Sequence, residues 1–185
     1  MARIPQPNRD QLPAGLKDAY DQAVATIGGQ IQAGPWPVVL NSPELALRRI
    51  NLADYLRKGT GLPNKILELA ILIAVRAMDC QYAWNAHAAT ARREGLDDAI
   101  VDAIRDKTAM PSMPAPEEAL VNFGTEFYAT HKVSQATFQK ALDQFGAQQL
   151  VELTSLMGHY AQTSFILNAF GVDAPEQRTE PLLPV

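Results

Sequence analysis

The chain has 185 residues, of which 47% are hydrophobic and 19% are charged, and its formal net charge is −4. This length suits one domain with a sizeable core. The negative charge argues against a nucleic-acid partner, because nucleic acid rewards clustered Lys and Arg.

Three further features of the sequence concern its location. The longest apolar run, Leu69 to Val75, is too short to span a bilayer. The segment from Met1 to Asn8 lacks the apolar core of a signal peptide. A single cysteine excludes an intramolecular disulfide framework and suits a reducing compartment. We therefore expect a cytoplasmic protein with no membrane partner.

Apolar residues recur with a period near 3.6, and no segment shows the sustained alternation of a β-strand, so we predict helices throughout. Pro35 and Pro37 push the residues before them out of the α region, which predicts a rigid loop over 34–37. Asp79 is the expected N-cap of the helix that follows the most apolar stretch. The predicted helices are 15–27, 42–58, one from 63 to before Asp79, 80–94, 97–107, 116–130, 134–145 and 148–170.

Two short motifs on successive predicted helices carry the strongest signal. The first is Glu68-Leu69-Ala70-Ile71-Leu72, and the second is Tyr82-Ala83-Trp84-Asn85-Ala86-His87, followed by Gly95-Leu96. In residue types, spacing and helix order they resemble the carboxymuconolactone decarboxylase-like and alkyl hydroperoxidase (AhpD-like) superfamily. Members pair an "E-L-x-I-L" helix with a "Y-x-W-x-x-H" helix and then a "G-L" turn.

The resemblance implies an all-α, single-domain bundle of about seven helices. On this basis we divide the chain into an N-terminal arm and helix (1–40), a carboxymuconolactone decarboxylase-like helical domain (41–172) and a proline-rich tail (173–185). It also implies a homo-oligomer, often built from trimers.

Two branches of the superfamily differ at one position of the second motif. The peroxidase branch carries Cys-x-x-Cys; this chain keeps the first cysteine as Cys80, but Ala83 stands in place of the second. The decarboxylase branch lacks the cysteine pair, keeps the Glu and the His, and opens and decarboxylates a small lactone acid with no metal or organic cofactor. By its motifs, this chain lies between the two branches.

Glu68, Cys80 and His87 are the predicted catalytic residues. Glu68 lies in an apolar stretch, so its carboxylate must be paired or have a raised pKa; the alternative to a catalytic role is a structural ion pair, with Arg76 or across an interface. The start of its helix would stabilise a Cys80 thiolate and lower the thiol pKa, although a free cysteine is more often a small buried hydrophobe. His87 shares a helix face with Cys80, but a rise of ~10 Å separates the two.

The predicted substrate-binding residues are Arg76, Tyr82 and Trp84. The structural alternatives are a salt bridge to Glu68 or Asp79 for Arg76 and core packing for Trp84, while Tyr82 points to another side of its helix. His131 and His159 show no metal-ligand spacing with His87, so we expect no metal site and no cofactor.

The basic pairs Arg48-Arg49 and Arg92-Arg93 are isolated from other basic residues. We therefore interpret each pair as part of a solvated helix face.

Three functions follow from these observations. The first is cofactor-free acid–base catalysis on a small carboxylated substrate, with a lactone acid as the leading guess, in which His87 moves the proton and Glu68 orients it. The second is peroxide reduction by Cys80 as a single nucleophilic cysteine. The third is a non-enzymatic helical oligomer that serves as a binding module.

Overall fold

Helices make up nearly all of the regular structure. A computed structural model describes residues 2–185, and within that range no strand is present. The helices are α1 (Ala14–Thr26), α2 (Trp36–Val39), α3 (Pro43–Asp54), α4 (Asn64–Ala77), α5 (Gln81–Arg93), α6 (Asp98–Asp106), α7 (Ala115–Thr130) and α8 (Gln135–Ala169), with a 3-10 turn at Arg9–Gln11 and a π-helical turn at Tyr55–Gly59. The predicted all-α fold is confirmed.

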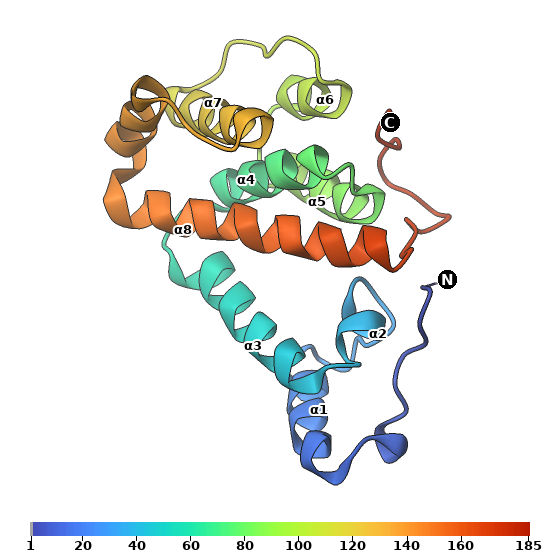
Figure 1. Cartoon of the computed structure of the whole chain (residues 1–185). Coiled ribbons are helices and arrows are strands. Elements are labelled where there is room, and N and C mark those ends of the chain that lie inside the picture. Colours follow the sequence, from blue (N-terminus) through green and yellow to red (C-terminus); the bar gives the residue numbers. More distant parts are fainter. Residues whose placement is uncertain (1) are drawn as a thin grey trace.

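Helix α4 is the centre of the molecule. All its residues from Ile66 to Arg76 are buried, and it packs against α5, α6, α7 and α8. Figure 1 shows α4 and α5 on one side of the long helix α8, with α1, α2 and α3 on the other. A helix that is apolar nearly all round needs neighbours on every side, and this arrangement supplies them.

A second, smaller core holds the N-terminal helices together. It is built from Tyr20 and Ala23 of α1, Leu40 after α2, and Ala46 and Ile50 of α3, and Ile166 of α8 packs against it. This core therefore combines helices from both sides of residue 40. The boundary that we placed at residue 40, between an N-terminal arm and the helical domain, stays a prediction.

Three local details differ from the sequence predictions. The segment predicted as a rigid loop contains the short helix α2, which Pro35 caps and in which Pro37 occupies the first turn, where proline is tolerated. Asp79 adopts a left-handed conformation with φ 47°, and Cys80 is the N-cap of α5 instead. The two last predicted helices form one element, α8, that is broken at Gly146 with φ 67° and ψ 171°.

The C-terminal tail packs on its own chain. Glu180 accepts a hydrogen bond from Arg92 Nε at 3.1 Å, the Leu183 N–H donates to Gln81 Oε1 at 2.8 Å, and Arg76 Nη2 donates to the Pro184 carbonyl at 3.0 Å. The tail thereby covers parts of α4 and α5. Within residues 2–185 no helix is both long enough and apolar enough to cross a lipid bilayer.

A close helix crossing at Gly124 generates a stability prediction. A Cβ atom at Gly124 of α7 would lie 2.7 Å from Ile73 Cγ2 of α4 and 2.7 Å from Met157 Cε of α8. Overpacking of this kind costs ~1–3 kcal/mol, which exceeds the ~1 kcal/mol by which alanine favours a helix over glycine. We expect Gly124→Ala to lower the free energy of unfolding by about 1 kcal/mol in urea denaturation.

Gly158→Ala is the matched control, because nothing lies within 4 Å of a Cβ atom at that helical position. Its free energy of unfolding should rise by up to ~1 kcal/mol. Equal effects of the two substitutions would contradict the close crossing at Gly124.

Candidate active site

Glu68 is a buried carboxylate with two partners from other elements. Its side chain is 4% exposed, and its Oε2 atom lies 2.7 Å from His87 Nδ1 of α5. Its Oε1 atom accepts a hydrogen bond from Arg57 Nη2 at 3.1 Å. Glu68 therefore forms its ion pair with Arg57 and not with Arg76, the partner named as an alternative from the sequence. Both carboxylate oxygens are satisfied, as burial of a charge requires.

The π-helical turn at the end of α3 brings Arg57 to this site. Its guanidinium also donates from Nη1 to the Tyr160 hydroxyl at 3.0 Å, so it joins Glu68 of α4 to α8. The turn brings residue 59 close to the Tyr55 ring, since a Cβ atom at Gly59 would lie 2.6 Å from Cδ2 of Tyr55. Short π-helical segments are frequent at functional sites. Sequence reasoning missed Arg57, since a regular helix to residue 58 gave no sign of the wider turn.

Tyr160 of α8 lies against the His87 ring. The two ring centroids are 4.8 Å apart in an edge-to-face arrangement. Burial raises the pKa of the Tyr160 hydroxyl, with the Arg57 charge acting in the opposite direction. The Tyr160 hydroxyl is therefore neutral near pH 7. Tyr160 was not singled out from the sequence.

A cavity of about 780 Å³ opens beside these groups. His87, Arg57 and Tyr160 all line it, and Tyr82, Ala83 and Ala86 complete the α5 side. Its apolar walls come from Ile27, Pro35, Trp36, Ile50 and Leu167, and its remaining polar lining includes Arg49, Asp54, Lys58, His159 and Thr163. A space of this size suits a small organic molecule.

Only one of the three predicted substrate-binding residues lines the cavity. Tyr82 does so, and its hydroxyl accepts a hydrogen bond from the Gly34 N–H at 2.7 Å, which ties the loop before α2 to α5. Trp84 is fully buried in the core around α4. Arg76 is buried too, pairs with Asp79 and donates from Nε to the Arg105 carbonyl at 2.7 Å. Arg76 thus forms a salt bridge and Trp84 packs in the core, and neither of them lines the cavity.

Cys80 lies in the core, not on the cavity. Its residue is 0% exposed, and it is not among the residues that line the space beside His87. Burial raises the pKa of the Cys80 thiol, while the backbone amides of Tyr82 and Ala83 act in the opposite direction. The expected effect of the helix start is therefore present, but desolvation outweighs it.

In each of the two basic pairs, one arginine is not solvated as predicted. Arg48 is solvated, but Arg49 is only 6% exposed. Arg92 is mostly covered as well, and it binds Asp98, Asp102 and Glu180. Within the described residues 2–185, no cluster of three or more His, Cys, Asp or Glu side chains could hold a metal ion.

The fold and the site together define an all-helical protein with a buried Glu–His pair at the wall of a cavity. Residues 43–123 match the model of the carboxymuconolactone decarboxylase family. No curated protein matches the chain at a significant level.

Two solved structures share the fold. One is protein ATU0492 of Agrobacterium tumefaciens, of unknown function and provisionally described as the antioxidant defence protein AhpD; it has a TM-score of 0.67 and 20% identity, over 75% of this chain and 96% of that one. The other is an uncharacterized peroxidase-related protein of Ralstonia eutropha JMP134 with an alkylhydroperoxidase AhpD core, with a TM-score of 0.71 and 17% identity, over 95% of this chain and 93% of that one.

The match over residues 43–123 supports the resemblance to the carboxymuconolactone decarboxylase family for that part of the chain. At these identities the two structures bear on the fold alone.

The environment of Cys80 predicts a slow thiol. We expect iodoacetamide to alkylate Cys80 of the folded protein far more slowly than in urea at the same pH, because the thiol is buried and its pKa is raised. Glu68→Gln should leave the pH profile of alkylation unchanged, since no hydrogen bond joins Glu68 to Cys80 within residues 2–185. Rapid alkylation of the native protein near pH 7, or a profile that moves in Glu68→Gln, would contradict this placement.

Proposed function

We propose that the protein is a carboxymuconolactone decarboxylase-like enzyme that performs acid–base catalysis on a small carboxylated molecule without a cofactor. The observation that carries the proposal is the 2.7 Å contact between His87 Nδ1 and the buried Glu68 carboxylate at the wall of the cavity. A lactone acid is the substrate class that we favour.

The geometry supports distinct roles for the two residues. When His87 Nδ1 carries the proton that binds Glu68, the other ring nitrogen, Nε2, is the one that accepts a proton in the neutral ring. The contact with Glu68 fixes the orientation of the ring, and a side chain that accepts and then returns a proton supplies general acid–base catalysis. Arg57 holds the second oxygen of Glu68 and so fixes the direction of the carboxylate.

In a decarboxylation, the bond between the carboxylate carbon and its neighbour breaks, and carbon dioxide leaves. The electron pair stays on the remaining carbon skeleton, which then needs a proton. His87, protonated and paired with Glu68, is the group on the cavity wall that we assign to deliver it. The apolar wall favours loss of charge from the carboxylate, because a charged group is poorly solvated there.

The environment of Cys80 weighs against peroxide reduction, the second hypothesis. The thiolate is the nucleophile in such chemistry, and here burial raises the pKa of the thiol. Peroxide would also have to reach a sulfur atom that is fully buried.

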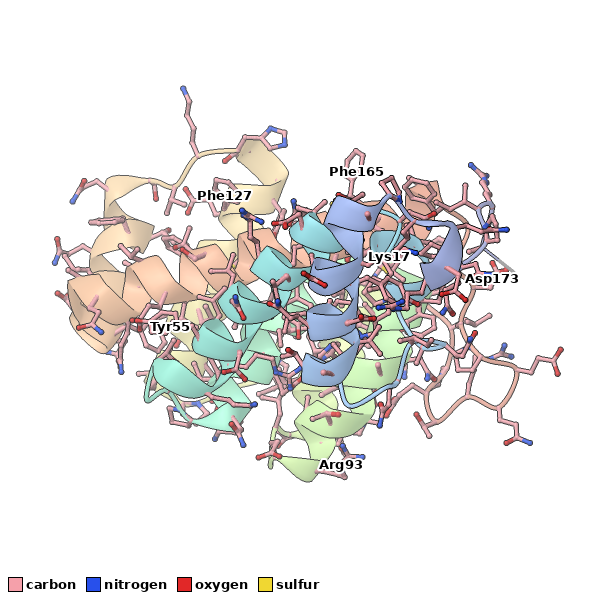
Figure 2. The ribbon with its side chains drawn as sticks, turned by 90° about the horizontal axis from the view of Figure 1, so that it is seen from below. Lys17, Tyr55, Arg93, Phe127, Phe165 and Asp173 are labelled. Carbon is pink, nitrogen blue, oxygen red and sulfur yellow. The ribbon has the colours of Figure 1, made fainter. Side chains whose placement is uncertain are left out.

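The homo-oligomer remains a prediction. Large apolar side chains are exposed on α3, on the π-helical turn and on α8, among them Leu52, Tyr55, Val151 and Phe165. Figure 2 shows Phe165 pointing outward from the ribbon, far from Tyr55 along the molecule. Surface of this kind supports association with further copies of the chain.

Substitutions at the pair test the proposed function. In a panel of small lactone and carboxylic acids, His87→Asn and Glu68→Gln should each lower turnover about 10²–10⁴-fold, the range ascribed to general acid–base catalysis. Carbon dioxide release and substrate absorbance are the measurements. Cys80→Ala should keep most of the turnover, because Cys80 lies outside the cavity.

Two other results would favour the alternatives. Peroxide-dependent turnover that disappears in Cys80→Ala would favour the peroxide reductase. If no acid of the panel is turned over, and His87→Asn and Glu68→Gln change only the free energy of unfolding, the binding module is favoured.

A further inference from the structure

One cation on the cavity wall has no counter-charge. Lys58 pairs with Asp54 at 2.5 Å, and Arg57 pairs with Glu68. Arg49 also lines the cavity, but within residues 2–185 no carboxylate lies within ion-pair distance of it. Among the Arg and Lys side chains that line the cavity within residues 2–185, Arg49 alone therefore lacks a carboxylate partner.

Arg49 is held in place by neutral acceptors alone. Its side chain binds Gln162 Oε1 through Nη1 and Thr163 Oγ1 through Nη2, the latter at 2.9 Å. Its Nε atom is buried and has no hydrogen-bond partner in the described part of the chain. Burial lowers the pKa of Arg49, with no carboxylate acting in the opposite direction. A buried guanidinium without an anion is costly, and an anionic ligand would relieve that cost.

His159 of α8 lines the same cavity as Arg49 of α3. Its Nδ1 atom is buried without a hydrogen-bond partner in residues 2–185. Burial and the Arg49 charge lower the pKa of His159 to about 4, so its ring is neutral near pH 7. A neutral imidazole has one donating and one accepting nitrogen, so it can add a hydrogen bond to a ligand without adding a second charge.

We propose that Arg49, supported by Thr163 and His159, forms a subsite that binds the anionic group, a carboxylate or a phosphate, of the small molecule that occupies the cavity. One uncompensated cation matches one singly charged group, which favours a carboxylate; in the proposed decarboxylation this carboxylate is not the one that leaves as carbon dioxide. The apolar residues Ile27, Trp36 and Ile50 lie on the same wall and suit a ligand with an apolar body. That this ligand is the substrate rests on the proposed function, whereas anion binding itself does not.

The subsite lies close to the Glu68–His87 pair. The Tyr160 ring contacts both imidazoles, with centroid distances of 4.8 Å to His87 and 5.6 Å to His159. A small molecule whose anionic group binds Arg49 can therefore present another part of its skeleton to His87. Arg49 would in this case fix which atom of the ligand receives the proton.

Calorimetric titration of the full chain with three small aromatic probes tests the subsite. The probes are benzoate, phenyl phosphate and the neutral benzamide, and the proteins are wild type, Arg49→Met and Arg48→Met. Arg48 is the matched control, since it is the adjacent arginine but is exposed and pairs with Glu44 on the surface. We expect benzoate to bind wild type and Arg48→Met alike, and to bind Arg49→Met about tenfold or more weakly, because a charge-assisted hydrogen bond is lost.

Benzamide should bind wild type about tenfold more weakly than benzoate for the same reason. Tighter binding of phenyl phosphate than of benzoate, also lost in Arg49→Met, would keep the subsite and assign it to a phosphate group. The proposal is overturned if Arg49→Met binds benzoate as wild type does, if Arg48→Met loses as much affinity, or if neither anion binds wild type.

Two further variants allow for a folding failure of Arg49→Met and separate anion binding from turnover. Arg49→Gln serves if Arg49→Met does not fold, because Gln removes the charge and keeps a polar side chain that can donate a hydrogen bond. His87→Asn should bind benzoate with unchanged affinity and yet lose turnover. Loss of turnover in His87→Asn without an effect of Arg49 would thus retain the proposed function and reject the anion subsite, and the reverse result would do the opposite.

Discussion

A carboxylate buried in the most apolar helix is the constraint on which the site depends. Glu68 lies among fully buried leucine, isoleucine and alanine side chains of α4, where an unpaired charge is not tolerated. Its two oxygens require partners, and Arg57 and His87 provide them from the π-helical turn and from α5. Removing one partner of such a pair leaves the other charge buried and costs ~3–5 kcal/mol when both are fully desolvated. Arg57 is 42% exposed, so solvent reduces the cost on its side.

Cys80 and His87, seven residues apart in the sequence, have opposite environments: one is buried in the core and the other lines the cavity. Both lie on α5 near the same stripe, but Cys80 is the N-cap residue and is enclosed by the core, while His87 reaches the cavity with 14% of its side chain exposed. Amide groups at the start of α5 favour a thiolate, and desolvation opposes it more strongly. Depth of burial thus separates the two side chains, since His87 lines the cavity and Cys80 does not.

The sequence was informative where a property repeats along the chain, and uninformative where it depends on contacts between distant segments. The 3.6-residue period and the two motifs were sufficient to predict α4, α5 and the Glu68–His87 pair. Arg48 and Arg49 are identical side chains at adjacent positions, and only the docking of α8 beside α3, with Gln162 and Thr163 as acceptors, makes one of them buried. The contact of Arg57 with Glu68 likewise depends on the π-helical turn at residues 55–59, which the helical period of the sequence does not predict.

The wall of the cavity is built from residues inside and outside the segment that matches the family model. Glu68, His87 and Arg57 lie within residues 43–123, the segment that matches the family model, whereas Trp36 precedes that segment and His159 follows it. The Glu68–His87 pair and the charged wall residues Arg49, Asp54 and Lys58 therefore lie inside the matched segment, whereas part of the apolar wall comes from flanking segments outside it. Two chains with the same pair can accordingly accept different molecules when these flanking segments differ, because the differential contacts made there decide which ligand is held beside the imidazole.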